Sequence, residues 1–355
     1  MNDLNSLLGI QLPIIQAPMA GTATPAMAAA VSNAGGLGSI SIAAVNAQAG
    51  REMIRQLRAA TDQPFNINVF CNIPSTPDAA VEQRWLQHLA PWFAEFGSQP
   101  PAAIHDIYTS LYNDDAQLQV LLEERPAVVS LHLGLPPQER IDALKAAGIV
   151  LFASATSLEE GRLVQAAGID MVVAQGIEAG GHRGIFDPDQ IDACLTTAEL
   201  VQELVRELDI PVIAAGGIMD GEDIAAMLDL GAVAAQLGTA FVLCPESAAN
   251  ASYRAMLSSE RAKQTQITRV ISGRPARGIF NRFMVEVGAE GHPPVPGFGI
   301  AYNAGKKLIE AASQAGSSEF AAHWAGMSAS KVRSLPAAQL LQTLHEEYQT
   351  IQKTR

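Results

Sequence analysis

The residues of this chain best suited to chemistry form the segment QGIEAGGHRG at 175–184. Its two adjacent glycines, Gly180 and Gly181, carry no side chains, so their backbone N–H groups can approach an anion closely. His182 follows directly and can donate, accept or take up a proton near neutral pH. The segment therefore predicts a phosphate-binding loop with a histidine beside the bound group.

Two further glycine segments follow along the chain. AAGGIMDG at 214–221 contains Gly216 and Gly217, and QLGT at 236–239 ends in Gly238 and Thr239. A single glycine pair often does no more than make a tight turn. Three such segments, each at the end of an apolar run, favour a phosphate site built from backbone N–H groups and the Thr239 hydroxyl.

The elements that position these loops are short apolar runs alternating with alanine-rich segments of helical composition. Several of those segments end in glycine (Gly35, Gly148, Gly168, Gly231), the residue that most readily closes a helix before a strand. Apolar strands alternating with helices predict a parallel sheet, and eight of them predict an α/β fold of the (β/α)₈ (TIM) barrel type, with its site at the C-terminal strand ends. The predicted strands are 13–18, 37–41, 65–70, 128–133, 150–154, 171–175, 211–215 and 233–237.

Two additions interrupt the barrel pattern. A helical insertion, 72–126, follows the third strand, and a mostly helical extension, 246–355, follows the eighth. We expect the two additions to form a helical lid and substrate region over a cofactor-binding barrel made of residues 10–71 and 127–245.

Composition narrows the class of protein. The chain has 355 residues, is 48% hydrophobic and carries a formal net charge of −13, which argues against a nucleic-acid partner. Its three cysteines show no C-x-x-C spacing, and no metal site is predicted. We also see no secretory signal and no apolar run near the ~20 residues that span a bilayer, so we expect a cytoplasmic protein without membrane contact, as a monomer or homodimer.

The pattern of glycines also narrows the cofactor. No G-x-G-x-x-G motif follows a strand, so a dinucleotide fold is unsupported. One phosphate site at a barrel mouth indicates a mononucleotide, and FMN is the common redox example. Asn68, Gln175 and Gln236 stand at strand ends, where their amides can hydrogen-bond a flavin ring or its ribityl chain.

Together with QAPMAGTATP at 16–25 and AVSNAGGLG at 30–38, the three glycine segments resemble the nitronate monooxygenases over about residues 10–310. The resemblance implies an FMN enzyme that uses O₂ to oxidise alkyl nitronates, such as toxic propionate 3-nitronate, to a carbonyl compound and nitrite. His182 is expected over the flavin ring. The residues implied to bind FMN are Ala17, Pro18, Met19, Asn68, Gln175, Gly180, Gly181, Gly216, Gly217, Gln236, Leu237, Gly238 and Thr239.

Other positions resemble the subgroup with true nitronate specificity. His132 ends the fourth strand, and Tyr302 and Lys306 are four residues apart, so they share one helix face. With His182, these three residues are the implied catalytic set. Tyr108, Tyr253 and Phe298 are expected in the substrate pocket, with Phe298 standing where the subgroup has a tyrosine.

Two other functions remain open at this point. The same glycine segments are shared by FMN-dependent NAD(P)H reductases that act on enoyl thioesters or quinones, and a flavin-binding protein without turnover is a third possibility. Tyr302 and Lys306 alone also fit a solvated helix face. Four arginines in the extension, Arg269, Arg274, Arg277 and Arg282, are expected to pair with acidic residues and fix the extension to the barrel.

Overall fold

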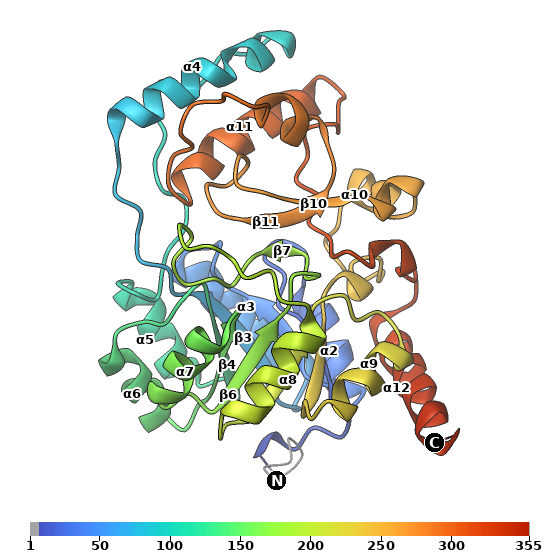
Figure 1. Ribbon diagram of the computed structural model, residues 1–355. Helices are drawn as coiled ribbons and strands as arrows, with labels where there is room; N and C mark the ends of the chain where they lie inside the picture. Colours follow the sequence, from blue (N-terminus) through green and yellow to red (C-terminus); the bar gives the residue numbers. More distant parts are fainter. Residues whose placement is uncertain (1–6, 355) are drawn as a thin grey trace.

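The computed structural model describes residues 7–354, and its centre is an eight-stranded parallel barrel (Figure 1). The strands follow one another in the order β1-β9-β8-β6-β5-β4-β3-β2, and a parallel bridge between Ile15 and Leu37 closes the ring. The predicted (β/α)₈ barrel is confirmed. The strands are β1 (Ile14–Gln16), β2 (Gly38–Ser41), β3 (Phe65–Phe70), β4 (Val128–His132), β5 (Val150–Ala155), β6 (Met171–Gln175), β8 (Val212–Ala215) and β9 (Ala234–Leu237).

Within the described residues, eight helices surround the barrel. Side-chain caps begin many of them; Thr196, for example, forms a capping box with Glu199 at the start of α8. Gly148 and Gly168 have φ of +80° and +76°, the left-handed conformation expected where a helix turns into the next strand. The helices are α2 (Pro25–Asn33), α3 (Ala47–Ala60), α5 (Asp115–Glu124), α6 (Gln138–Ala146), α7 (Leu158–Ala166), α8 (Thr197–Glu207), α9 (Gly221–Asp229) and α12 (Ala337–Thr354).

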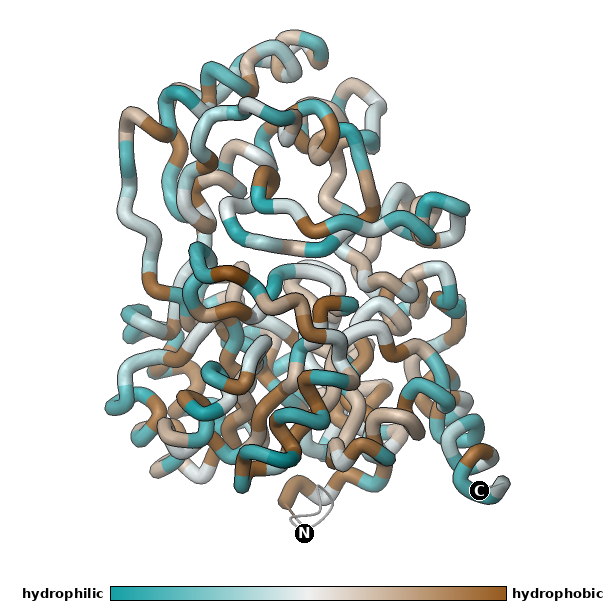
Figure 2. Tube along the Cα trace, viewed as in Figure 1, coloured by the Kyte–Doolittle hydropathy of each residue, from teal (hydrophilic) through white to brown (hydrophobic). Residues whose placement is uncertain are grey.

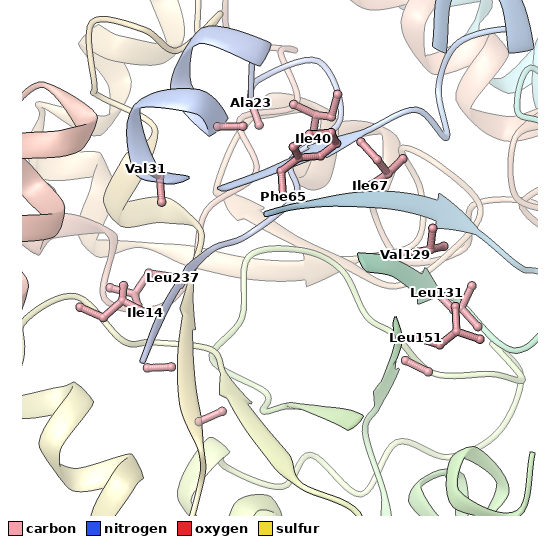
Figure 3. Close-up of a cluster of buried hydrophobic side chains, with 14 of the residues drawn as sticks. Ile14, Ala23, Val31, Ile40, Phe65, Ile67, Val129, Leu131, Leu151 and Leu237 are labelled. Atoms are coloured by element: carbon pink, nitrogen blue, oxygen red, sulfur yellow. The ribbon is translucent and has the colours of Figure 1, made fainter. Parts of the chain in front are cut away.

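Strand alternation divides the apolar residues of the barrel between two cores. Successive side chains point to opposite faces of a strand, so Ile14 joins the core between sheet and helices while Ile15 joins a second cluster. Val129 and Val128 divide in the same way. Figure 3 shows part of the first core, which includes side chains from several strands and Val31 of α2. The second cluster fills the inside of the barrel and forms the floor on which a site can rest.

A lid stands over the C-terminal ends of the strands (Figure 1). It has its own hydrophobic core, in which Trp85 and Phe93 of one helix meet Leu308 of another, and hydrophobic segments occur in the lid as well as in the barrel (Figure 2). A three-stranded antiparallel sheet, in the order β10-β11-β7, lies between lid and barrel. The elements are α4 (Ala79–Glu95), β7 (Gly181–His182), η1 (Thr239–Phe241), α10 (Ala251–Leu257), η2 (Glu260–Lys263), β10 (Thr265–Thr268), β11 (Ala276–Ile279), η3 (Phe283–Val287), α11 (Ile300–Gln314) and η4 (Ala329–Lys331).

The composition of the lid differs from the expectation in two respects. Helices α5 and α12 fall inside the ranges assigned to the lid, 72–126 and 246–355, but they pack in the barrel ring, because their apolar faces complete the core between sheet and helices. The extension also contains the β10–β11 ribbon, where a mostly helical segment was expected. Within residues 7–354, no helix combines the length and apolar character needed to cross a membrane.

Candidate active site

A cavity of about 230 Å³ opens at the C-terminal ends of the strands, beneath the lid. The strand alternation explains its lining. Val173 and Ala215 belong both to the inner cluster of the barrel and to the cavity wall, and the inward-facing residues one step further along the strands are polar or small. Ser41, Asn68, Ser130, His132, Ser154, Gln175 and Gln236 all reach the cavity in this way.

One wall of the cavity offers backbone N–H groups to an anion. Those of Gly180, Gly217 and Gly238 donate no hydrogen bond to any other described part of the chain. Thr239 Oγ1 accepts a hydrogen bond from Gly326 N at 3.0 Å, which leaves its own proton available. This arrangement of unpaired donors suits a phosphate group.

Gly180 is also confined by the lid. A Cβ on this residue would lie 2.5 Å from Gly326 N and 2.6 Å from Ala325 C, which are backbone atoms that cannot turn away. The glycine is therefore needed for the close approach of the loop to the segment 325–326.

The three strand-end amides have different surroundings. Asn68 Oδ1 accepts from Ser41 Oγ at 3.0 Å, and its Nδ2 donates to the Ser130 carbonyl at 3.0 Å. The Gln175 amide donates to the His182 carbonyl at 3.1 Å and accepts from Gly184 N at 2.6 Å, so it holds the glycine–histidine loop in place. By contrast, the Gln236 amide has no protein partner among the described residues and is free for a ligand.

Two histidines lie side by side in the cavity. His132 contacts Ser154 Oγ through Nδ1 at 2.9 Å and the His182 carbonyl through Nε2 at 3.2 Å. Burial is the largest cause that lowers the pKa of His132 to about 4 and that of His182 to about 3, and the charge of Arg274 contributes to both shifts. Both imidazoles are therefore neutral at physiological pH.

The opposite wall of the cavity is aromatic. The ring of His182 lies 5.4 Å from that of Trp324 and 6.2 Å from that of Tyr302, between ring centroids. Tyr302 Oη accepts from Trp324 Nε1 at 3.2 Å, so its own proton is free. Burial raises the pKa of Tyr302 and of Tyr108, and both hydroxyls stay protonated hydrogen-bond donors.

Three of the residues expected at the site do not line the cavity. Leu237 faces the core between sheet and helices, because the strand alternation turns its side chain away from the inside of the barrel. Phe298 is buried behind the wall, with its ring 5.1 Å from that of His182 and stacked on Tyr108. Lys306 is an exposed residue whose Nζ lies 5.2 Å and 5.0 Å from the ring centroids of Tyr108 and Tyr302.

The other residues expected at the site all line the cavity. They are Ala17, Pro18, Met19, Asn68, Tyr108, His132, Gln175, Gly180, Gly181, His182, Gly216, Gly217, Gln236, Gly238, Thr239, Tyr253 and Tyr302.

Sequence reasoning missed several residues of the wall. Ser130 precedes His132 by two positions, and this period-2 spacing was a usable signal for it. Trp324 had no such signal, since the lid brings it to the cavity from a segment without a motif. Glu178, within the glycine–histidine segment, points away from the cavity and accepts from Thr197 N and Oγ1 at the start of α8.

Buried arginines add positive charge behind the histidines. Arg183 binds Asp192, and Arg274 donates to the carbonyls of Ile185 and Phe186. Arg269, Arg274 and Arg277 join the extension to the barrel, but only Arg269 does so through an acidic partner, and Arg282 pairs within the lid. Arg269 pairs with Asp189 and Arg282 with Glu95 and Glu286, whereas Arg274 and Arg277 bind backbone carbonyls. No group of three or more potential metal ligands occurs within residues 7–354.

Comparisons with known proteins agree with this geometry. A family model described as nitronate monooxygenase matches residues 2–347. The nitronate monooxygenase of Pseudomonas aeruginosa is 55% identical over 341 residues, which cover 96% of this chain and 97% of that protein. The solved structure of a nitroalkane oxidase from Streptomyces ansochromogenes has 37% identity and a TM-score of 0.88, with 99% of each chain covered. FabK from Thermotoga maritima has 30% identity and a TM-score of 0.75, with 100% of this chain and 99% of that chain covered.

These matches run along almost the whole chain and confirm the resemblance inferred from the glycine segments. Proteins of the matched family are flavin-dependent oxidoreductases. The chain belongs to the nitronate monooxygenase family.

Proposed function

We propose that this protein oxidises alkyl nitronates with O₂ to a carbonyl compound and nitrite, with FMN as its flavin and propionate 3-nitronate as a detoxified substrate. The observation that carries the proposal is the pairing, in one cavity, of a backbone cradle for a phosphate with a neutral histidine pair and an aromatic wall.

The residues present fit FMN. Unpaired N–H groups at Gly180, Gly217 and Gly238 match a single phosphate, and the free amide of Gln236 can hydrogen-bond the flavin. Ala17 to Met19 supply a backbone edge along the same cavity. When bound, the flavin accepts electrons from the substrate and reacts with oxygen, and the protein contributes position and charge.

The substrate is an anion, and the charges around the cavity favour an anion. Both histidines are neutral, while Arg274 and Lys306 bring positive charge close enough to lower the pKa of His182. Protonated Tyr302 and Tyr108 can donate hydrogen bonds to nitronate oxygens. We therefore assign orientation of the nitronate to these hydroxyls and the electrostatic preference for it to the cations behind the wall.

His182 can act as a base when the substrate is a neutral nitroalkane. A nitronate arrives deprotonated and needs no base. A nitroalkane must first lose a proton from carbon, and a neutral imidazole at the cavity wall can accept it. Replacing His182 with Asn is then expected to lower kcat/KM for a nitroalkane, while the amount of bound flavin stays near one per chain.

One experiment separates the proposed activity from that of an NAD(P)H reductase. Purified yellow protein is mixed anaerobically with NADH, NADPH or propionate 3-nitronate while the flavin absorbance is followed, and nitrite and oxygen uptake are measured in air. A response to the nitronate alone, with nitrite formed, supports the proposal. Rapid bleaching by NADH or NADPH contradicts it, and no response to any reagent indicates a flavin-binding protein without turnover.

A further inference from the structure

The side chain of His182 is held by a residue of the lid. Ser272 is fully buried in the turn between β10 and β11, the ribbon whose second strand pairs with β7. In that pairing Ala276 lies opposite His182. The turn therefore reaches the histidine from a ribbon that already fixes its backbone.

The hydrogen bonds around Ser272 determine which nitrogen of His182 carries the proton. Ser272 Oγ donates to the Arg274 carbonyl at 3.1 Å and lies 2.9 Å from His182 Nε2. A hydroxyl has one proton and a carbonyl oxygen can only accept. With the Ser272 proton on the Arg274 carbonyl, His182 Nε2 is the donor in its contact with Ser272.

The other ring nitrogen is then left for a ligand. A neutral imidazole with a proton on Nε2 has a lone pair on Nδ1. No residue in the range 7–354 donates a hydrogen bond to His182 Nδ1, and the side chain lines the cavity.

The same logic applies to His132, whose Nε2 must donate to the His182 carbonyl while Nδ1 accepts from Ser154.

We propose that Ser272 is a positioning residue that holds His182 as the neutral Nε2–H tautomer, with the Nδ1 lone pair presented to the substrate carbon. The inference rests on the proposed function for the identity of the substrate. In the step it serves, the C–H bond of a neutral nitroalkane breaks, the proton moves to Nδ1, and the electron pair remains on the substrate as a nitronate. Nε2–H keeps its bond to Ser272 throughout.

The direct test reads the tautomer of the wild-type holoprotein. The chain has seven histidines, so ¹⁵N-histidine labelling gives a simple long-range ¹H–¹⁵N spectrum, and His182→Asn identifies the His182 signals. A protonated Nε2 and an unprotonated Nδ1 are expected. The reverse pattern, with the proton on Nδ1, overturns the inference without any variant of Ser272.

The kinetic test uses a neutral nitroalkane and its own nitronate. Ser272→Ala is expected to lower kcat/KM for nitroethane at least about tenfold, the scale of one lost hydrogen bond to a catalytic group, and to change that for ethyl nitronate less than about threefold. Ser272→Thr keeps the hydroxyl and should restore the ratio. Equal losses on both substrates, with His182 still protonated on Nε2, would show that Ser272 acts only on stability.

The two proposals can fail separately. A wild-type protein that turns over no nitronate removes the proposed function but leaves the tautomer measurement unaffected. A wild-type protein that is active on nitroethane with His182 protonated on Nδ1 removes only the role of Ser272.

Discussion

Arg183 is the buried charge on which the glycine–histidine loop depends most directly. Its side chain is 1% exposed, and Nη1 donates to the carbonyls of Gln175 and Gly176, at 2.9 Å each. Nε and Nη2 bind the carboxylate of Asp192 at 2.8 Å and 3.1 Å. Replacing Arg183 with Met keeps much of the volume and removes these four hydrogen bonds, together with a long one from Nη1 to Gln175 Oε1 at 3.5 Å.

The loss in the free energy of unfolding follows from the hydrogen-bond acceptors that Arg183 leaves behind. The carbonyls of Gln175 and Gly176 and the partly buried carboxylate of Asp192 each lose a charged donor, while Gly176 keeps Ala179 N and Asp192 keeps Cys194 N. Breaking a buried ion pair from one side costs about 3–5 kcal/mol. A chain of 355 residues unfolds with an entropy of about 0.75 kcal/mol/K at its midpoint, so Tm should fall by about 4–7 °C. We also expect less flavin retained per chain, because Gln175 then loses its anchor.

The assay is thermal unfolding of purified protein, with flavin per chain measured by absorbance after gel filtration. Arg162→Met is the matched control, since Arg162 is 61% exposed and pairs only with Glu207. Replacing Arg162 should lower the free energy of unfolding by less than about 1 kcal/mol, which lowers Tm by at most just over ~1 °C. A Tm for Arg183→Met within 1 °C of the wild type would refute the reasoning that these buried bonds stabilise the loop.

Three other predictions concern the loop, the histidines and the lid. Gly180→Ala should weaken flavin binding at least about tenfold in a flavin titration of the apoprotein, because the new Cβ meets the backbone of segment 325–326. Gly148→Ala is the control, since a Cβ there has no atom within 4 Å. It should lower the free energy of unfolding only by the ~1–2 kcal/mol of a left-handed residue and leave the flavin affinity unchanged. Lys306→Met should raise KM for a nitronate about fivefold with little change in kcat, the effect of about 1 kcal/mol in binding. An unchanged KM would show that the charge of Lys306 does not contribute to binding the nitronate. Burial lowers the pKa of three histidines below the ~6.5 of the unfolded chain, so the unfolded state binds more protons than the folded state below that pH. The free energy of unfolding should therefore keep its full value above about pH 6.5. As the pH drops toward 4, it should fall by about 1.4 kcal/mol per pH unit for each histidine. Urea midpoints that do not change between pH 7 and pH 5 would contradict this; the histidines are His132, His182 and His323, with pKa lowered to about 4, 3 and 4.

The barrel was predictable because its signals are local. An apolar run followed by a glycine-terminated helix identifies each β/α unit, and parallel strands place all their C-terminal ends at one rim. The glycine segments at 175–184, 214–221 and 236–239 therefore had to meet, and they do.

What the sequence left open depends on contacts between distant segments. Helix periodicity shows that α12 has an apolar face but not which surface covers it. The two-residue strand β7 exists only because β11 lies beside it. Ser272 and Trp324 sit in segments without a motif, and only the folded lid brings them to His182.

The position of α12 has a consequence for how the molecule is made. The helix fills the space between α9 and α2, and its backbone approaches α9 so closely that a Cβ on Gly221 would lie 2.3 Å from Tyr348 N. The first helix of the ring, α2, and the last, α12, thus become neighbours only after residues 337–354 have left the ribosome. A nascent chain that has not yet released residues 337–354 carries an open ring with Val31 and Ile224 lacking their outer cover. Docking of α12, rather than pairing of the last strand, is then the event that closes the ring of helices around the barrel.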